Sequence, residues 1–157
     1  MHIPDGYVDL PIALLCGALS VAVLAVAAWR VDGEVPDARA PLLGVVAAGI
    51  FAAQMLNWPI PGGTSAHFVG GAFAAIMLGP HLGSLAVATV VVIQALVFGD
   101  GGLVALGANV FNMAVVEVYV GYGVYRLLAP SGEYRAAFAA GWLGITAGAL
   151  TAGVQLG

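Results

Sequence analysis

The chain has 157 residues, of which 62% are apolar and 8% are charged, and its formal net charge is −4. Soluble domains carry about 25% charged residues, so this composition excludes a water-soluble surface and predicts one integral membrane domain over residues 1–157. The acidic balance argues against nucleic acid as a partner, because nucleic acid requires clustered Lys and Arg. A single cysteine excludes a disulfide framework.

Apolar runs of about 20 residues can cross a bilayer as helices. Such runs predict an all-α, polytopic transmembrane bundle of about six spans. They cover roughly residues 10–29, 41–57, 67–79, 82–98, 108–127 and 136–157. The last run is still apolar at Gly157, so we expect further sequence beyond this residue.

The connections between these runs are rich in Gly and Pro. WPIPGGTSA (58–66) and GDGGLVALG (99–107) are expected to be loops. The third and fourth runs are short and are separated only by Gly79-Pro80-His81, so they form either two short helices or a re-entrant hairpin.

Four arginines decide the predicted orientation in the cell membrane. Arg30 and Arg39 flank the first polar segment, and Arg126 and Arg135 flank the last. Cytoplasmic loops are enriched in Lys and Arg, so alternating spans place all four inside the cell and the N-terminus outside.

The same alternation sorts the three histidines. His2 lies in the external N-terminal segment and His67 in the external region 58–67, whereas His81 lies in a cytoplasmic connection. The topology therefore pairs His2 with His67 and excludes His81.

The opening MHIPDG has the donors of a metal chelate. The Met1 amine and the His2 amide nitrogen close a five-membered ring on one ion, and the amide nitrogen and His2 Nδ1 close a six-membered ring. These three nitrogens are coplanar if the amide loses its proton, and His67 is the best candidate for the fourth. Planar nitrogen ligation favours Ni(II) or Cu(II), with cobalt and zinc still open, so Met1, His2 and His67 are the predicted metal ligands. The alternative is a structural role for the histidines, such as a hydrogen bond from His67 to a loop carbonyl.

Several polar residues allow more than one interpretation of their role. Asp5 either orients His2 or caps a turn, and Asp100 is most simply a turn residue. Asn109 and Asn112 lie one turn apart and are expected to brace the loop that contains His67. Glu117 is either an ion relay or a protonated, hydrogen-bonded side chain.

Small residues form a smooth face on the first span, at Ala18, Ala22 and Ala25. This face either packs inside the bundle or docks a partner subunit. Catalytic residues are not predicted, because the sequence contains no Walker A, nucleophile-elbow or HExxH motif.

Four segments follow one another between residue 1 and about residue 128, namely MHIPDGY, PIPGGTSAHFVGG, QALVFGDGGLVALGANVFNMAVV and GYGVYRL. In these segments the chain resembles the CbiM/NikM family, the substrate-binding (S) membrane subunits of nickel and cobalt energy-coupling factor transporters. The resemblance implies a seven-helix bundle with the N-terminus tucked into the external face. It also implies that the Met1 amine, the His2 backbone nitrogen and imidazole, and His67 hold the transported metal.

The same resemblance implies that this chain is not an enzyme and has no cofactor of its own. Such subunits work with a transmembrane coupling (T) subunit and cytoplasmic ATPase subunits, often with a small auxiliary membrane subunit. The function predicted is high-affinity capture and import of Ni²⁺ or Co²⁺ in an ABC-type transporter. The alternative is a ligand-free structural or assembly subunit, and a membrane enzyme using Glu117 or Asp100 is the least favoured reading.

Overall fold

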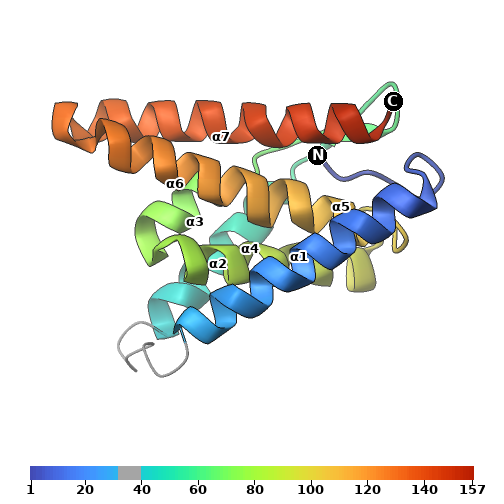
Figure 1. Ribbon diagram of the computed structural model, residues 1–157, viewed down its shortest axis with the longest axis horizontal. Helices are drawn as coiled ribbons and strands as arrows, with labels where there is room; N and C mark the ends of the chain where they lie inside the picture. The colour runs from blue at the N-terminus through green and yellow to red at the C-terminus, as the bar shows by residue number, and fades with distance from the viewer. Residues whose placement is uncertain (32–39) are drawn as a thin grey trace.

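The computed structural model describes residues 1–31 and 40–157, which form a bundle of six helical segments (Figure 1). They are α1 (Leu10–Val31), α2 (Ala40–Gln54), α3 (Gly71–Leu78), α4 (Pro80–Ile93) with its π-helical continuation η2 (Gln94–Phe98), the unit α5 (Leu106–Val110), η3 (Phe111–Val116) and α6 (Glu117–Leu128), and α7 (Glu133–Gln155). A short 3-10 turn, η4 (Ala129–Ser131), joins α6 to α7. The predicted all-α bundle of about six spans is confirmed.

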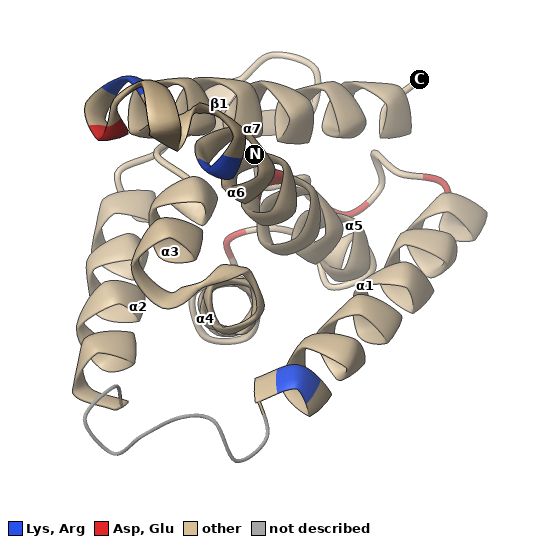
Figure 2. Cartoon of the chain, turned by 60° about the vertical axis from the view of Figure 1, so that its left-hand side comes forward, with Lys and Arg blue, Asp and Glu red and all other residues tan. Residues whose placement is uncertain are grey.

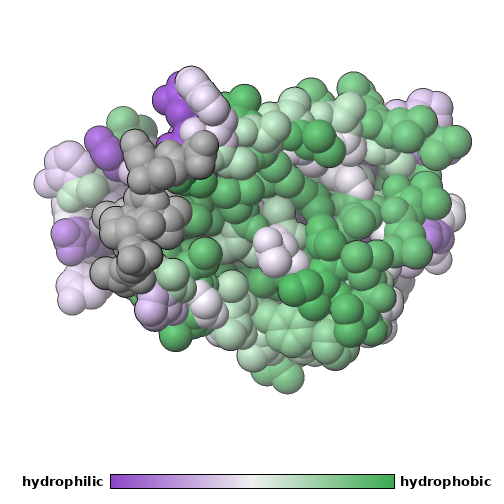
Figure 3. All heavy atoms as spheres, turned by 90° about the horizontal axis from the view of Figure 1, so that it is seen from below, coloured by the Kyte–Doolittle hydropathy of each residue, from purple (hydrophilic) through white to green (hydrophobic). Residues whose placement is uncertain are grey.

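Three of these helices are long and apolar enough to cross a membrane, namely α1, α4 with η2, and α7. Large apolar side chains of α1 and α7, among them Leu14, Trp29 and Trp142, face outward and are more than half exposed. The space-filling view in Figure 3 shows a broad apolar surface of this kind, with polar residues near its edges. Such a surface is stable against lipid and not against water.

The third and fourth runs, expected as two short helices or a re-entrant hairpin, differ in length. The second of them is one long helix, α4 with η2, while α3 has only eight residues. Eight residues of helix span about 12 Å, which is less than half of the roughly 30 Å hydrocarbon core of a bilayer. Residues 67–70, which precede α3, are non-helical chain. Non-helical backbone at membrane depth must be satisfied by protein groups. Gln54 Nε2 donates to the Val69 carbonyl at 2.6 Å, and Glu117 Oε1 accepts from Gly71 N at 2.9 Å.

α7 packs on α6 along a stripe of small residues. The buried small residues of α7 recur every four residues, at Ala136, Ala140, Gly144, Gly148 and Ala152, and Gln155 is buried at its end. A Cβ added to Gly144 would lie 3.0 Å from the Glu117 carbonyl oxygen and 3.3 Å from Gly121 Cα. The helices therefore approach until their backbones touch, as small-residue interfaces in membranes allow.

The segment 58–66, predicted as a loop, forms a short antiparallel hairpin. β1 (Trp58–Ile60) pairs with β2 (Thr64–Ala66), with Trp58 opposite Ala66 and Ile60 opposite Thr64. The Tyr7 ring packs on the turn at Gly63, where φ is +95° and a Cβ would lie 2.1 Å from the ring. The hairpin thus lies against the N-terminal segment, and its second strand ends one residue before His67.

The two ends of the bundle differ in charge. In Figure 2 the blue segments lie at the ends of α1 and α6 and at the start of α7, which contain Arg30, Arg126 and Arg135. Arg39 lies outside the described residues. The N-terminal segment, the hairpin and the 99–105 connection gather at the opposite end of the same helices (Figure 1).

Candidate metal centre

The first residues of the chain lie inside the protein. Met1 is 7% exposed and His2 is 3% exposed, while Ile3 is completely buried against Val8, Ala13 and other apolar side chains. Asn109 holds Ile3 by a reciprocal pair of hydrogen bonds. Its Oδ1 accepts from Ile3 N at 2.8 Å, and its Nδ2 donates to Ile3 O at 3.0 Å.

Asp5 fixes the segment to the start of the fifth span. Its carboxylate accepts hydrogen bonds from the backbone N–H groups of Leu103, Val104 and Ala105 at 3.0, 2.8 and 3.1 Å. These amides precede α5, so Asp5 satisfies donors that a helix N-terminus otherwise leaves free. The side chain therefore caps another segment and does not orient His2, in contrast to the first of its two readings.

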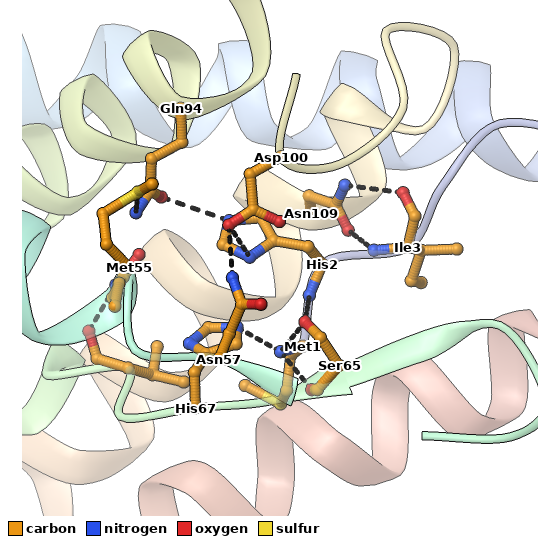
Figure 4. A network of polar contacts seen from close by, with 12 residues as sticks. Met1, His2, Ile3, Met55, Asn57, Ser65, His67, Gln94, Asp100 and Asn109 are labelled. Carbon is orange, nitrogen blue, oxygen red and sulfur yellow. Dashed lines mark hydrogen bonds and ion pairs between the residues drawn. The ribbon is translucent and has the colours of Figure 1, made fainter. Parts of the chain in front are cut away.

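The hairpin brings Ser65 and His67 to the chain terminus (Figure 4). The Met1 amine donates to Ser65 O at 2.7 Å, lies 3.4 Å from Ser65 Oγ, and contacts His67 Nε2 directly. The His2 backbone N–H donates to Ser65 Oγ at 3.2 Å. The rings of His2 and His67 stack with centroids 4.7 Å apart. The structure thus brings the three predicted residues together.

Hydrogen bonds select the tautomer of each imidazole. His67 Nδ1 lies 2.7 Å from the Phe68 carbonyl oxygen, so it bears the proton and leaves a lone pair on Nε2. His2 Nε2 lies 3.1 Å from Gln94 Oε1, so it bears the proton and leaves the lone pair on Nδ1. A hydrogen bond from the second ring nitrogen commonly orients a ligating histidine in this way.

Burial keeps all three groups neutral. It lowers the pKa of the Met1 amine to about 5, although the charges of Asp100 and Glu117 oppose this shift. Burial, assisted by the nearby terminal amine, lowers the pKa of His2 and of His67 to about 4 each. At neutral pH their nitrogens therefore hold lone pairs, which is the form that binds a metal ion.

The arrangement suits a planar nitrogen site. The Met1 amine and His67 Nε2 are in direct contact, so both atoms are available as adjacent ligands of one ion. Within the described residues, three or more His, Cys, Asp or Glu side chains do not gather around one point. The donors at this place include main-chain nitrogens, as the predicted N-terminal chelate requires. Ligation by Met1, His2 and His67 stays a prediction.

Three residues around the site were not predicted as such. Gln94, Ser65 and Asp100 contact His2 or Met1, and Asp100 Oδ2 lies 3.5 Å from His2 Nδ1. Asp100 is therefore more than the turn residue expected, and burial raises the pKa of its carboxyl group. Gln94 lies in a π-helical turn, η2. Such turns frequently mark functional sites, but a sequence pattern does not reveal them.

Other candidates lie elsewhere. Asn109 holds the N-terminal segment and Asn112 pairs with Gln155, so neither braces the loop of His67 as expected. His81 Nδ1 lies 3.0 Å from the Tyr119 hydroxyl, at the far end of α4 from Gln94. Its predicted separation from the other two histidines is confirmed.

Comparison with known proteins assigns the fold to a family. Residues 2–157 match CbiM, described as the cobalt uptake substrate-specific transmembrane region. The chain belongs to the CbiM family. This membership confirms the predicted resemblance, and the family is one of transport proteins and not of enzymes.

Relatives in the CbiM family are named for nickel or cobalt. The chain is 60% identical over 157 residues to the putative fused nickel transport protein NikMN of Archaeoglobus fulgidus, and it spans 52% of that protein. It is 36% identical over 160 residues to the cobalt transport protein CbiM of Kyrpidia tusciae, covering 99% of this chain and 65% of that protein. The crystal structure of a truncated transition metal transporter matches with a TM-score of 0.96 at 42% identity, covering 100% of this chain and 74% of that one.

Proposed function

We propose that this chain captures Ni²⁺ or Co²⁺ at the external face of the cell membrane, as the S subunit of an energy-coupling factor transporter. The observation that carries the proposal is the buried cluster of Met1, His2 and His67, in which the Met1 amine contacts His67 Nε2 and the two imidazole rings stack. The names of the relatives support transport of these metals.

High affinity is expected because hydrogen bonds within the protein hold the terminal residues in place. The Asn109 and Asp5 hydrogen bonds already hold the terminal residues in place, so binding does not have to order a loose tail. Neutral nitrogen donors favour nickel and cobalt over magnesium and calcium, which prefer oxygen ligands.

Import requires partners, and one face is available for them. Ala18, Ala22 and Ala25 on α1 are exposed, so the small-residue face does not pack against the other described residues. This favours docking of a transmembrane coupling subunit, with ATP hydrolysis by cytoplasmic ATPase subunits. Arg30, Arg126 and Arg135 at the opposite end support an external N-terminus.

The test is metal binding by protein with a native, unblocked N-terminus. We expect about one nickel or cobalt ion per chain, with binding abolished by His2→Ala or by acetylation of the Met1 amine. His81→Ala is the matched control and should bind normally, because His81 contacts Tyr119. Unchanged binding after acetylation would refute the proposal, and protein without affinity for either metal would favour a ligand-free assembly subunit.

A further inference from the structure

A small polar pocket lies directly beside the metal centre. It has a volume of about 260 Å³ and is lined by His2, Asn57, Thr64, Asp100 and neighbouring residues. Figure 4 shows His2, Asn57 and Asp100 pointing toward one another at this place. Asn57 Nδ2 donates to Asp100 Oδ2 at 2.7 Å, so the carboxylate is held in one orientation.

Two buried polar atoms on this pocket have no hydrogen-bond partner among the described residues. They are His2 Nδ1, whose side chain is 2% exposed, and Thr64 Oγ1. A buried polar atom without a partner is costly, so each is expected to meet a ligand or a water molecule that enters the pocket. The Asp100 side chain is 19% exposed and provides a negative charge there.

We propose that this pocket is a vestibule that receives the hydrated divalent cation, with Asp100 as the first contact before transfer to the nitrogen ligands. The inference rests on the proposed function, and it adds a second, oxygen-based subsite to the nitrogen site. The amine and imidazole donors carry no negative charge and are buried, so they do not attract a distant cation. A fixed carboxylate at the mouth of a cleft concentrates cations and raises their association rate.

The distances allow a direct transfer. Metal–oxygen and metal–nitrogen bonds are each about 2.0–2.2 Å, and Asp100 Oδ2 lies 3.5 Å from His2 Nδ1. One ion can therefore contact both atoms at the same time. Thr64 Oγ1 and the Asp100 carboxylate accept hydrogen bonds from the ion's water molecules, which leave as nitrogens replace them.

The test is the rate of nickel association, measured by stopped flow. Asp100→Asn keeps the shape and the Asn57 contact while removing the charge, and it should slow association by about tenfold, within the 10- to 1,000-fold range of electrostatic steering. Asp100→Glu should recover most of the rate. Asp9→Asn is the matched control, because Asp9 is exposed near the same end of the bundle and is not part of the pocket; it should stay within twofold of the wild type.

Association by Asp100→Asn within twofold of the wild type would overturn the vestibule while leaving nickel capture intact. Equal slowing by Asp9→Asn, or no recovery with Asp100→Glu, would overturn it as well. A second arm does not depend on the nitrogen site. Mn²⁺ favours oxygen ligands, and its binding is detected by electron paramagnetic resonance. It should still bind weakly to the His67→Ala variant and should not bind to the double variant His67→Ala/Asp100→Asn. Mn²⁺ binding that is absent, or equal in both variants, counts against the vestibule.

Discussion

Replacing Asn109 with alanine tests whether docking of the N-terminus governs metal affinity. Asn109 touches the backbone of Ile3 and is not a predicted ligand. The change removes two buried hydrogen bonds of 2.8 and 3.0 Å. Each such bond contributes about 0.5–1.5 kcal/mol net, so docking weakens by about 1–3 kcal/mol.

The metal binds only the form in which the N-terminal segment is docked, so the apparent affinity falls as the undocked fraction of the metal-free protein rises. With tenfold per 1.4 kcal/mol, we expect nickel binding to weaken by up to about 5- to 150-fold. Isothermal titration of detergent-solubilised protein, or competition with a chelator, measures this change.

Asn112→Ala is the matched control. Asn112 lies three residues later on the same helical unit, is equally buried, and makes two side-chain hydrogen bonds with Gln155 at 2.7 and 2.9 Å. Its replacement should lower thermal stability to a similar degree while leaving nickel affinity within about threefold, since those bonds stabilise helix packing. Equal weakening by both variants, or unchanged binding by Asn109→Ala, would show that docking does not govern affinity.

Three further predictions concern protonation, tautomer and space. The pKa values of about 5 for the Met1 amine and about 4 for His2 and His67 imply that, above pH 6, only the His2 amide proton competes with the metal. The logarithm of the nickel affinity should therefore rise by about one per pH unit between pH 6 and 8, and its slope should become steeper below pH 5. A slope near two at neutral pH would contradict a neutral amine. Gln94→Met removes the acceptor of His2 Nε2 and should weaken binding by about 10- to 100-fold, measured by titration against the wild type. Gly102→Ala would put a Cβ 2.0 Å from Asp5 Oδ1, whereas Gly49→Ala meets no atom within 4 Å, so only the former should displace the N-terminus and reduce binding; equal effects of the two changes would count against this steric argument.

Composition and hydropathy predicted the helices well, because a membrane span must be apolar along its whole length. The weaker predictions concern places where backbone is satisfied by distant partners. The hairpin at 58–66 and the non-helical residues before α3 depend on contacts such as Gln54 with Val69. Local composition does not predict contacts between residues far apart in the fold, so the Gly and Pro residues indicate only a loop.

At the candidate metal centre, too, some features were predictable from the sequence and others depend on contacts between distant residues. His2 and His67 were predictable because topology alone placed them at one end of the bundle. The partners of Asn109 and Asp5 lie about one hundred residues away in the sequence, so their roles follow from tertiary packing. An aspartate next to glycine is common in turns, so the sequence indicates only a turn at Asp100, and its approach to His2 depends on the folded connection.

The position of the proposed chelate at the chain terminus explains why so few distant parts must meet. Two consecutive residues supply three nitrogens, and their spacing is fixed by covalent geometry, so tertiary structure has to deliver only His67 and hold the first six residues. The hairpin delivers His67, and Asp5 and Asn109 hold the segment. Burial then favours the deprotonated form of the amine at neutral pH, because it lowers the pKa of the Met1 amine from 8.0 to about 5. An exposed amine would be mostly protonated at pH 7 and would have to release that proton to bind a metal ion, which is why the terminus is useful as a ligand only when the fold encloses it.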